Sequence, residues 1–187
     1  MRFQKLNLYV KKKNRISIII AKLIWDFFGK PLFSSYLPGT YWRKFILRIF
    51  GAKIGKGGKL KNNIKISEPW NLLIGDHCWI GENVWIDNLA LVKIGNRVCI
   101  SQGVYLCTGN HNYKKDLFNL ILKKIVIEDD CWIAAKSIIA PGSILKRGSV
   151  SCLGTVVSGI LQKDGIYKGN PAKLLKSKDD NLSLIHI

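Results

Sequence analysis

A six-residue repeat of aliphatic side chains runs through most of this sequence and limits its fold more than any other feature. The repeat marks are Ile74, Ile80, Ile86, Ile94, Ile100, Leu106, Ile127, Ile133, Ile139, Leu145, Ser151 and Val157. All are aliphatic except Ser151, and a small or turn-forming residue usually follows each mark. An α-helix has about 3.6 residues per turn, so a period of six matches no helical face. A hexapeptide period is instead typical of a parallel β-helix, in which each repeat supplies one short strand and one corner.

A second set of smaller residues follows the marks by four positions, and we expect these side chains to point inward as well. The set is Cys78, Val84, Ala90, Val98, Val104, Cys131, Ser137, Ser143, Ser149 and Thr155. Intervals of eight residues at 66–74 and 86–94 predict two extra residues at one corner of a coil. We therefore predict an all-β fold, a parallel β-helix over residues 51–162, with three strands per coil in a triangular prism.

Residues 1–50 form a basic and apolar segment before the repeat. They carry eleven Lys or Arg against the single acid Asp26, which is +10 of the net charge of +18. Residues 16–28 and 41–50 predict two amphipathic helices, separated by a turn region from Pro31 to Pro38. The first is shorter than the roughly 20 residues of a membrane-spanning helix. Such helices suit an anionic membrane surface, and they equally suit a cap over the open end of the β-helix.

Other features narrow the class of protein. The positive charge comes without a nucleic-acid-binding motif, so we expect no nucleic-acid partner. The five cysteines lack paired or CxxC spacing, which favours reduced thiols in a cytoplasmic protein. The first fifteen residues are too polar for a cleavable signal peptide. We take residues 163–181 as a C-terminal extension and interpret residues 182–187 as the translation of a sequencing-library adaptor.

The repeat has one large interruption, between Leu106 and Ile127. We place a loop at residues 107–126, and long loops on rigid scaffolds are commonly functional. His111 stands near the start of this loop. Because imidazole can take a proton from a hydroxyl group near neutral pH, we predict that His111 is a general base.

Four motifs together resemble the hexapeptide-repeat O-acetyltransferases, and among them the colanic-acid type that modifies bacterial exopolysaccharides. The motifs are Phe50–Gly55 before the repeat, Ile100–Leu106, Cys107–Tyr113 in the loop and the closing Gly169–Lys173. The resemblance covers roughly residues 10–175. It implies a left-handed β-helix, a homotrimer with active sites at the subunit boundaries, and acetyl-CoA as the acetyl donor, with no metal required.

The same resemblance implies roles for individual residues. His111 would take the proton of the acceptor hydroxyl, and the backbone N–H of Ala135 would stabilise the oxyanion of the tetrahedral intermediate. The implied contacts are Trp132, Ala134, Ala135, Leu153, Ser158 and Lys173 for acetyl-CoA, and Asn88, Asn110 and Asn112 for the acceptor. Related loops carry an acid where this chain has Asn112, so a carboxylate partner for the imidazole would come from Asp116, Asp87 or Glu128.

These observations predict a cytoplasmic O-acetyltransferase, held at the inner face of the cell membrane, that acts on a sugar or a lipid-linked oligosaccharide in exopolysaccharide biosynthesis. Two alternatives stay open: an acyltransferase that depends on an acyl carrier protein, and a non-catalytic trimeric scaffold at a membrane surface. A β-helix carbonic anhydrase needs three histidines on zinc, and the repeat holds only His77 and His111.

Overall fold

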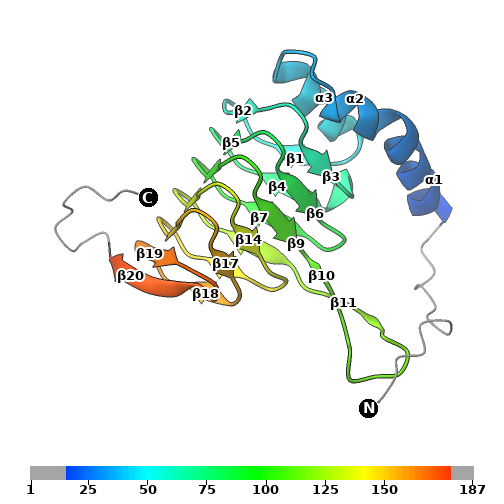
Figure 1. Ribbon diagram of the computed structural model, residues 1–187. Helices are drawn as coiled ribbons and strands as arrows, with labels where there is room; N and C mark the ends of the chain where they lie inside the picture. Colours follow the sequence, from blue (N-terminus) through cyan, green and yellow to red (C-terminus); the bar gives the residue numbers. More distant parts are fainter. Residues whose placement is uncertain (1–15, 178–187) are drawn as a thin grey trace.

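The computed structural model of the protein describes residues 16–177, and the predictions for residues 1–15 and 182–187 lie outside this range (Figure 1). Short parallel strands stack into the three walls of a triangular prism, and the chain visits the walls in the order A, B, C on each coil. The fold is a left-handed parallel β-helix with N-terminal helices, as predicted. We call the walls faces A, B and C, and the corners between them the AB, BC and CA edges.

The strands of each face follow one another along the prism. Face A holds β1 (Lys53–Ile54), β4 (Leu72–Ile74), β7 (Val92–Ile94), β12 (Ile125–Ile127), β15 (Ile144–Leu145) and β18 (Ile160–Leu161). Face B holds β2 (Lys59–Leu60), β5 (Trp79–Ile80), β8 (Cys99–Ile100), β13 (Trp132–Ile133), β16 (Val150–Ser151), β19 (Gly165–Lys168) and the antiparallel β20 (Lys173–Ser177). Face C holds β3 (Lys65–Ile66), β6 (Trp85–Asp87), β9 (Tyr105–Cys107), β14 (Ile138–Ile139) and β17 (Val156–Val157). The prism therefore continues through β19, inside the segment predicted as an extension.

The inward side chains follow the predicted period. All twelve repeat marks are buried, and nine of the ten smaller residues are buried with them. Ala90 is the exception and is only half-buried, because the CA edge at this coil has two extra residues. Asn88 is buried at this corner instead: its Oδ1 accepts from the N–H groups of Ser67 and Glu68, and its Nδ2 donates to the Glu68 carbonyl.

The N-terminal helices cover the first coil of the prism. The segments α1 (Ile16–Ile24), η2 (Trp25–Gly29, a π-helical turn) and α2 (Lys30–Ser34) form one continuous helix, which we call helix 16–34. The predicted start of the turn region at Pro31 was wrong, because the helix continues through Pro31 and ends at Ser34. Proline has no N–H to donate, and it is tolerated here at the first turn of α2, directly after the π-helical turn.

Aromatic anchors hold this cap in place. Trp25 and Phe33 of helix 16–34 and Leu47 of α3 (Tyr41–Ile49) are fully buried in the main core. The Trp25 indole also donates a 3.0 Å hydrogen bond from Nε1 to the carbonyl of Ile66 in β3. The cap interpretation of residues 1–50 is therefore confirmed for its described part.

The basic residues of α3 do not form the exposed polar stripe that its sequence suggested. Arg43 is buried, and its guanidinium donates to the carbonyls of Phe33, Ser35, Leu37 and Gly39, which fixes the turn between the helices. Burial lowers the pKa of the Arg43 side chain. Lys44 is also buried and donates to the Gly57 carbonyl. Within residues 16–177, no helix has the length and apolarity needed to cross a bilayer.

Candidate active site

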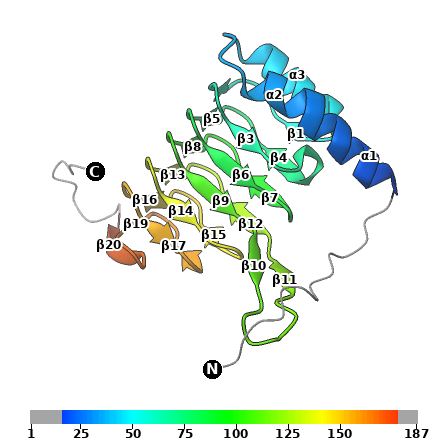
Figure 2. The same cartoon turned by 45° about the vertical axis from the view of Figure 1, so that its right-hand side comes forward.

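The interruption of the repeat forms a β-hairpin that projects from the CA edge (Figures 1 and 2). Its strands are β10 (Gly109–His111) and β11 (Leu120–Leu122), paired antiparallel with His111 opposite Leu120. A short 3₁₀ turn, η3 (Pro69–Asn71), lies at the same edge of the first coil. The predicted loop at residues 107–126 thus contains a two-stranded element that the sequence did not reveal.

The hairpin fixes the orientation of His111. Its Nδ1 lies 2.8 Å from the carbonyl oxygen of Phe118, and its ring stacks on the Phe118 ring with centroids 4.3 Å apart and planes 6° apart. Because a carbonyl oxygen only accepts, Nδ1 carries the hydrogen in this contact. In the neutral ring, Nε2 then has the lone pair that a general base needs.

Phe118 holds a backbone conformation that bulky residues rarely adopt. Its φ is 48°, in the left-handed region, where a residue with a large side chain is strained. This conformation places both the Phe118 carbonyl and its ring against His111. Phe118 is a residue that sequence reasoning missed, and no local signal in the sequence identifies it.

The asparagines beside His111 shape the hairpin. Asn110 accepts the backbone N–H of His111 at 2.8 Å, and Asn112 accepts that of Lys114 at 3.1 Å, both through the side-chain oxygen. Asn88, in contrast, is fully buried and uses its oxygen and its amide inside the CA edge. This geometry gives Asn88 a structural role and does not support contact with an acceptor.

The three carboxylates considered as partners of His111 lie in different places. Glu128 lies at the AB edge, where it accepts from Lys146 Nζ at 3.0 Å and from the Arg147 N–H at 2.9 Å. These two contacts lower its pKa, the Arg147 N–H having the larger effect. Asp87 ends β6 on face C, in register with Cys107, and accepts from Ser67 Oγ at 2.8 Å. Asp116 is in the turn of the hairpin itself.

An aromatic pair on face C lies beside Asp87. Trp85 and Tyr105 stack with ring centroids 4.6 Å apart, and the Tyr105 hydroxyl lies 3.4 Å from Asp87 Oδ2. Burial, with the neighbouring Cys107 and Asp87, raises the pKa of Tyr105 well above its usual value. Sequence reasoning missed both aromatic residues, although each precedes a repeat mark by one position and therefore points outward.

Three of the predicted acetyl-CoA contacts lie together at the BC edge. Ala134 and Ala135 form this edge on one coil and Leu153 on the next, where Gly154 donates to the Ala135 carbonyl. The nearby Trp132 is partly exposed on face B and donates from Nε1 to Ser101 Oγ. Lys173 begins β20, directly after Ala172, whose N–H donates to the Val156 carbonyl of face C. Ser158 is separate from this row, because it follows β17 at the CA edge.

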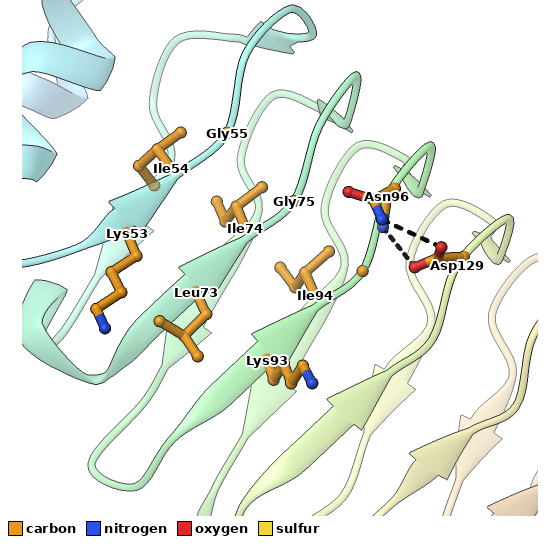
Figure 3. A pocket seen from close by; sticks show the side chains of 11 residues that line it. Lys53, Ile54, Gly55, Leu73, Ile74, Gly75, Lys93, Ile94, Asn96 and Asp129 are labelled. Atoms are coloured by element: carbon orange, nitrogen blue, oxygen red, sulfur yellow. Dashed lines mark hydrogen bonds between the residues drawn. The ribbon is translucent and has the colours of Figure 1, made fainter.

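The AB and BC edges differ in how their outer N–H groups are used. At the AB edge a ladder of side chains accepts them: Asp76 from Lys56, Asn96 from Asp76, and Asp129 from Asn96. Figure 3 shows the contact between Asn96 and Asp129. Among the described residues, no intramolecular acceptor takes the corresponding N–H groups of the BC edge, at Glu82, Gln102, Ala135 and Leu153. The BC edge therefore presents a row of backbone donors that a bound molecule can use.

A groove of about 480 Å³ lies on face A next to the AB edge and is lined by Lys53, Leu73, Lys93, Asn96 and Asp129 (Figure 3). None of the predicted site residues lines it. Among residues 16–177 there is also no cluster of three His, Cys, Asp or Glu side chains that could hold a metal ion. The chemistry that the sequence predicted therefore concentrates on the hairpin and the BC edge.

One chain does not bring His111 and Ala135 together. The strands of face C run from the BC edge, where Ala135 lies, to the CA edge, from which the His111 hairpin projects. The two groups therefore lie at opposite ends of face C. Within one chain the two groups therefore do not form a common site.

Comparison with known proteins identifies relatives, although no family model matches the chain. The chain is 38% identical over 137 residues to the protein of Escherichia coli K12 named as the colanic acid biosynthesis acetyltransferase WcaF, covering 73% of this chain and 75% of the relative. It is 23% identical over 141 residues to the galactoside O-acetyltransferase of the same strain, covering 74% of this chain and 70% of the relative.

The fold matches a solved acetyltransferase over nearly its full length. A hexapeptide-repeat acetyltransferase from Vibrio cholerae, in complex with acetyl-CoA, superposes with a TM-score of 0.82 and 25% identity, covering 92% of this chain and 94% of that one. The repeat, the left-handed prism and the 38% identity agree with one another. This chain belongs to the hexapeptide-repeat acetyltransferase family.

Proposed function

We propose that this protein transfers the acetyl group of acetyl-CoA to a hydroxyl group of a sugar in exopolysaccharide biosynthesis. The observation that carries the proposal is the contact between His111 Nδ1 and the Phe118 carbonyl. It gives the imidazole the tautomer of a base, with Nε2 as the acceptor of a hydroxyl proton.

The reaction follows from two groups of the protein. His111 Nε2 takes the proton from the acceptor hydroxyl while the hydroxyl oxygen attacks the thioester carbon. The N–H of Ala135 donates to the oxyanion of the tetrahedral intermediate, and a backbone donor of this kind is typically worth about 3–4 kcal/mol of transition-state stabilisation. The C–S bond then breaks, and the leaving thiolate takes the proton from His111. An O-acetyl ester and a free thiol result.

The BC edge supports the proposed place of acetyl-CoA. Its row of outward N–H groups can donate to the amide carbonyls of the pantetheine chain, alongside Trp132, Ala134 and Leu153. Lys173 lies near the end of this row, where its ammonium group suits the phosphates. Ser158 lies at the CA edge, as the His111 hairpin does, so it would contact acetyl-CoA bound to a neighbouring protomer.

We further propose a homotrimer in which the CA edge of one protomer faces the BC edge of the next. The separation of His111 and Ala135 across face C supports this arrangement, because only a neighbour can complete the site. A threefold ring closes such a head-to-tail contact without leaving an unpaired edge.

The acceptor is proposed to be a sugar or a lipid-linked oligosaccharide that meets the hairpin. Asn110 and Asn112 flank His111 in the chain, and their side-chain amides can donate to sugar hydroxyls. We also propose that the enzyme works in the cytoplasm at the inner face of the cell membrane, held there through residues 1–50. The six Lys or Arg of residues 1–15, which include no acid, support attraction to anionic lipid.

A transfer assay tests this function. Purified protein is given acetyl-CoA and a panel of sugars and oligosaccharides, and thiol release and ester formation are measured. The His111→Ala variant should lose about 10²–10⁴-fold in kcat, the usual contribution of a general base. The control is His77→Asn, at an exposed AB corner with φ 58°, which asparagine adopts readily. Full activity of His111→Ala would refute the general-base role, absence of transfer by the parent with every donor and acceptor would favour the non-catalytic scaffold, and activity only with an acyl carrier protein thioester would favour that alternative.

A further inference from the structure

The outer face of helix 16–34 is apolar along its whole length. It consists of Ile16, Ile19, Ile20, Leu23, Ile24, Phe27, Phe28 and Leu32, all exposed. Phe27 and Phe28 are 73% and 75% exposed, and α1 has no buried residue at all. A continuous exposed apolar surface of this kind marks an interaction site on a folded protein.

The charges of this helix lie along its flank and not on its outer face. Lys22 and Lys30 flank Asp26 at four-residue spacing, with N–O distances of 3.6 Å and 3.8 Å. Lys22 also lies 3.9 Å from Glu68 of the prism. A helix that covers a protein core normally turns its charges outward and its apolar stripe inward. Here Trp25 and Phe33 point into the core, the ion pairs line the flank, and a second apolar stripe points away from the prism.

The position of this face relates it to the active site. Glu68 lies at the CA edge of the first coil, and the His111 hairpin leaves the same edge two coils further on, about 10 Å along the prism. Helix 16–34 and the hairpin extend from the same side of the molecule in both views (Figures 1 and 2). The hairpin itself exposes Tyr113, Leu117, Ile121 and Leu122 on its way out.

The charge of the adjoining chain indicates what covers the outer face. Residues 1–15, directly before α1, hold six Lys or Arg and no acid. A second copy of the chain would bring six more positive charges to the same place, and like charges repel. A surface of anionic lipid would instead neutralise them, at about 1 kcal/mol for each basic residue near the headgroups.

We infer that the outer face of helix 16–34 binds an anionic membrane surface. The helix lies in the plane of the interface with Phe27 and Phe28 inserted below the headgroups, as amphipathic interfacial helices do. This orientation keeps the CA edge of the first coil close to the lipid, with the His111 hairpin about 10 Å further along the prism. Membrane binding by this face does not depend on the proposed function. Only its consequence does, namely that the hairpin meets an acceptor held at the membrane.

Flotation with vesicles tests the inference separately from catalysis. The full chain is mixed at low salt with phosphatidylcholine vesicles that contain phosphatidylglycerol, and bound protein is measured after centrifugation. Binding is expected, and the double variant Phe27→Gln, Phe28→Gln should lower the partition coefficient at least tenfold. The control Trp79→Gln removes an aromatic residue that is 54% exposed on face B and should bind as the parent does.

Three further readings separate the outcomes. The double variant should keep the kcat of the parent on a water-soluble acceptor and its circular dichroism spectrum, because both side chains are exposed. The His111→Ala variant should float as the parent does. Parent protein that stays unbound, or a double variant that floats fully, would overturn the inference while leaving acetyl transfer intact. A double variant that loses its oligomeric state but not its flotation would assign the face to a second copy.

Discussion

Replacement of Trp25 tests whether helix 16–34 holds the open end of the prism closed. Its ring is fully buried, with its centroid 5.0 Å from that of Phe50 and 6.0 Å from that of Phe33, and Nε1 donates to the Ile66 carbonyl at 3.0 Å. Trp25→Ala removes these contacts and leaves a cavity, a change that usually destabilises by about 3–5 kcal/mol. For a chain of this size, about 2–4 °C per kcal/mol predicts a fall in Tm of about 6–20 °C.

A second variant isolates the hydrogen bond. Trp25→Phe keeps an aromatic ring but leaves the Ile66 carbonyl without its donor, so a smaller fall is expected, from about 1–3 kcal/mol. Phe28→Ala, three positions along the same helix and 75% exposed, is the matched control and should leave Tm nearly unchanged. Thermal unfolding is followed by circular dichroism at one protein concentration, since assembly shifts Tm. Equal Tm values for parent and Trp25→Ala would refute the anchoring role.

Three further predictions concern the base, the corners and the AB ladder. Phe118→Gly relieves the backbone strain of the left-handed conformation but removes the ring stacked on His111, so kcat should fall about 10–100-fold through loss of positioning. Phe118→Tyr keeps the ring and should retain activity. Equal kcat values for the parent, Phe118→Gly and Phe118→Tyr would contradict this role. Gly75→Ala should lower Tm, because the added Cβ would lie 2.5 Å from Asn96 Oδ1 and 2.6 Å from the Gly95 carbonyl, whereas Gly109→Ala, with its nearest neighbour at 3.6 Å, should not. Asp129→Asn should lower the urea midpoint of unfolding at pH 7 more than at pH 3, because hydrogen bonds from Asn96 lower the pKa of Asp129. The stabilisation by the Asp129 carboxylate is present above the unfolded-state pKa and is lost as the pH falls through the folded-state pKa. An equal loss at both pH values would contradict this account.

The sequence predicted the prism because its inward residues repeat with the period of the coil. Every mark except Ser151 is aliphatic, and each, such as Ile86 or Ile133, is the residue of its hexapeptide that the wall turns inward. The alternation of buried and exposed residues therefore determines which side chains of each strand face inward, and this can be predicted without knowledge of contacts between distant residues. The position of Ala135 at a corner followed from the same count.

The parts that the sequence did not predict depend on contacts between distant residues. The Asn88 side chain is buried because the neighbouring coil presents the N–H groups of Ser67 and Glu68, which lie about twenty positions away in the chain. Helix 16–34 continues through Pro31 because Trp25 is anchored to β3 and the π-helical turn directly before α2 accommodates a residue without a backbone N–H. The orientation of His111 depends on the backbone of Phe118, and no sequence pattern indicates that this phenylalanine adopts a left-handed backbone conformation.

The central claim is that His111 of one protomer acts on a thioester held at the BC edge of the next. Ala135→Pro removes the proposed oxyanion donor and little else. Ala135 precedes Lys136, which has a φ of 61°, in a turn closed by the Ser137 N–H and the Ala134 carbonyl, and proline is favoured at that place in such turns. Pro141 before Gly142 is a natural example in this chain, at another corner of the same coil.

The direct measurement is acetyl transfer by trimers that mix His111→Ala and Ala135→Pro protomers. Each variant alone should be nearly inactive, since every site then lacks either the base or the oxyanion donor. Equal mixing should restore about a quarter of the parental sites, because a head-to-tail interface pairs an intact hairpin with an intact BC edge at that frequency. Mixed trimers with no more activity than the separate variants would contradict the shared site.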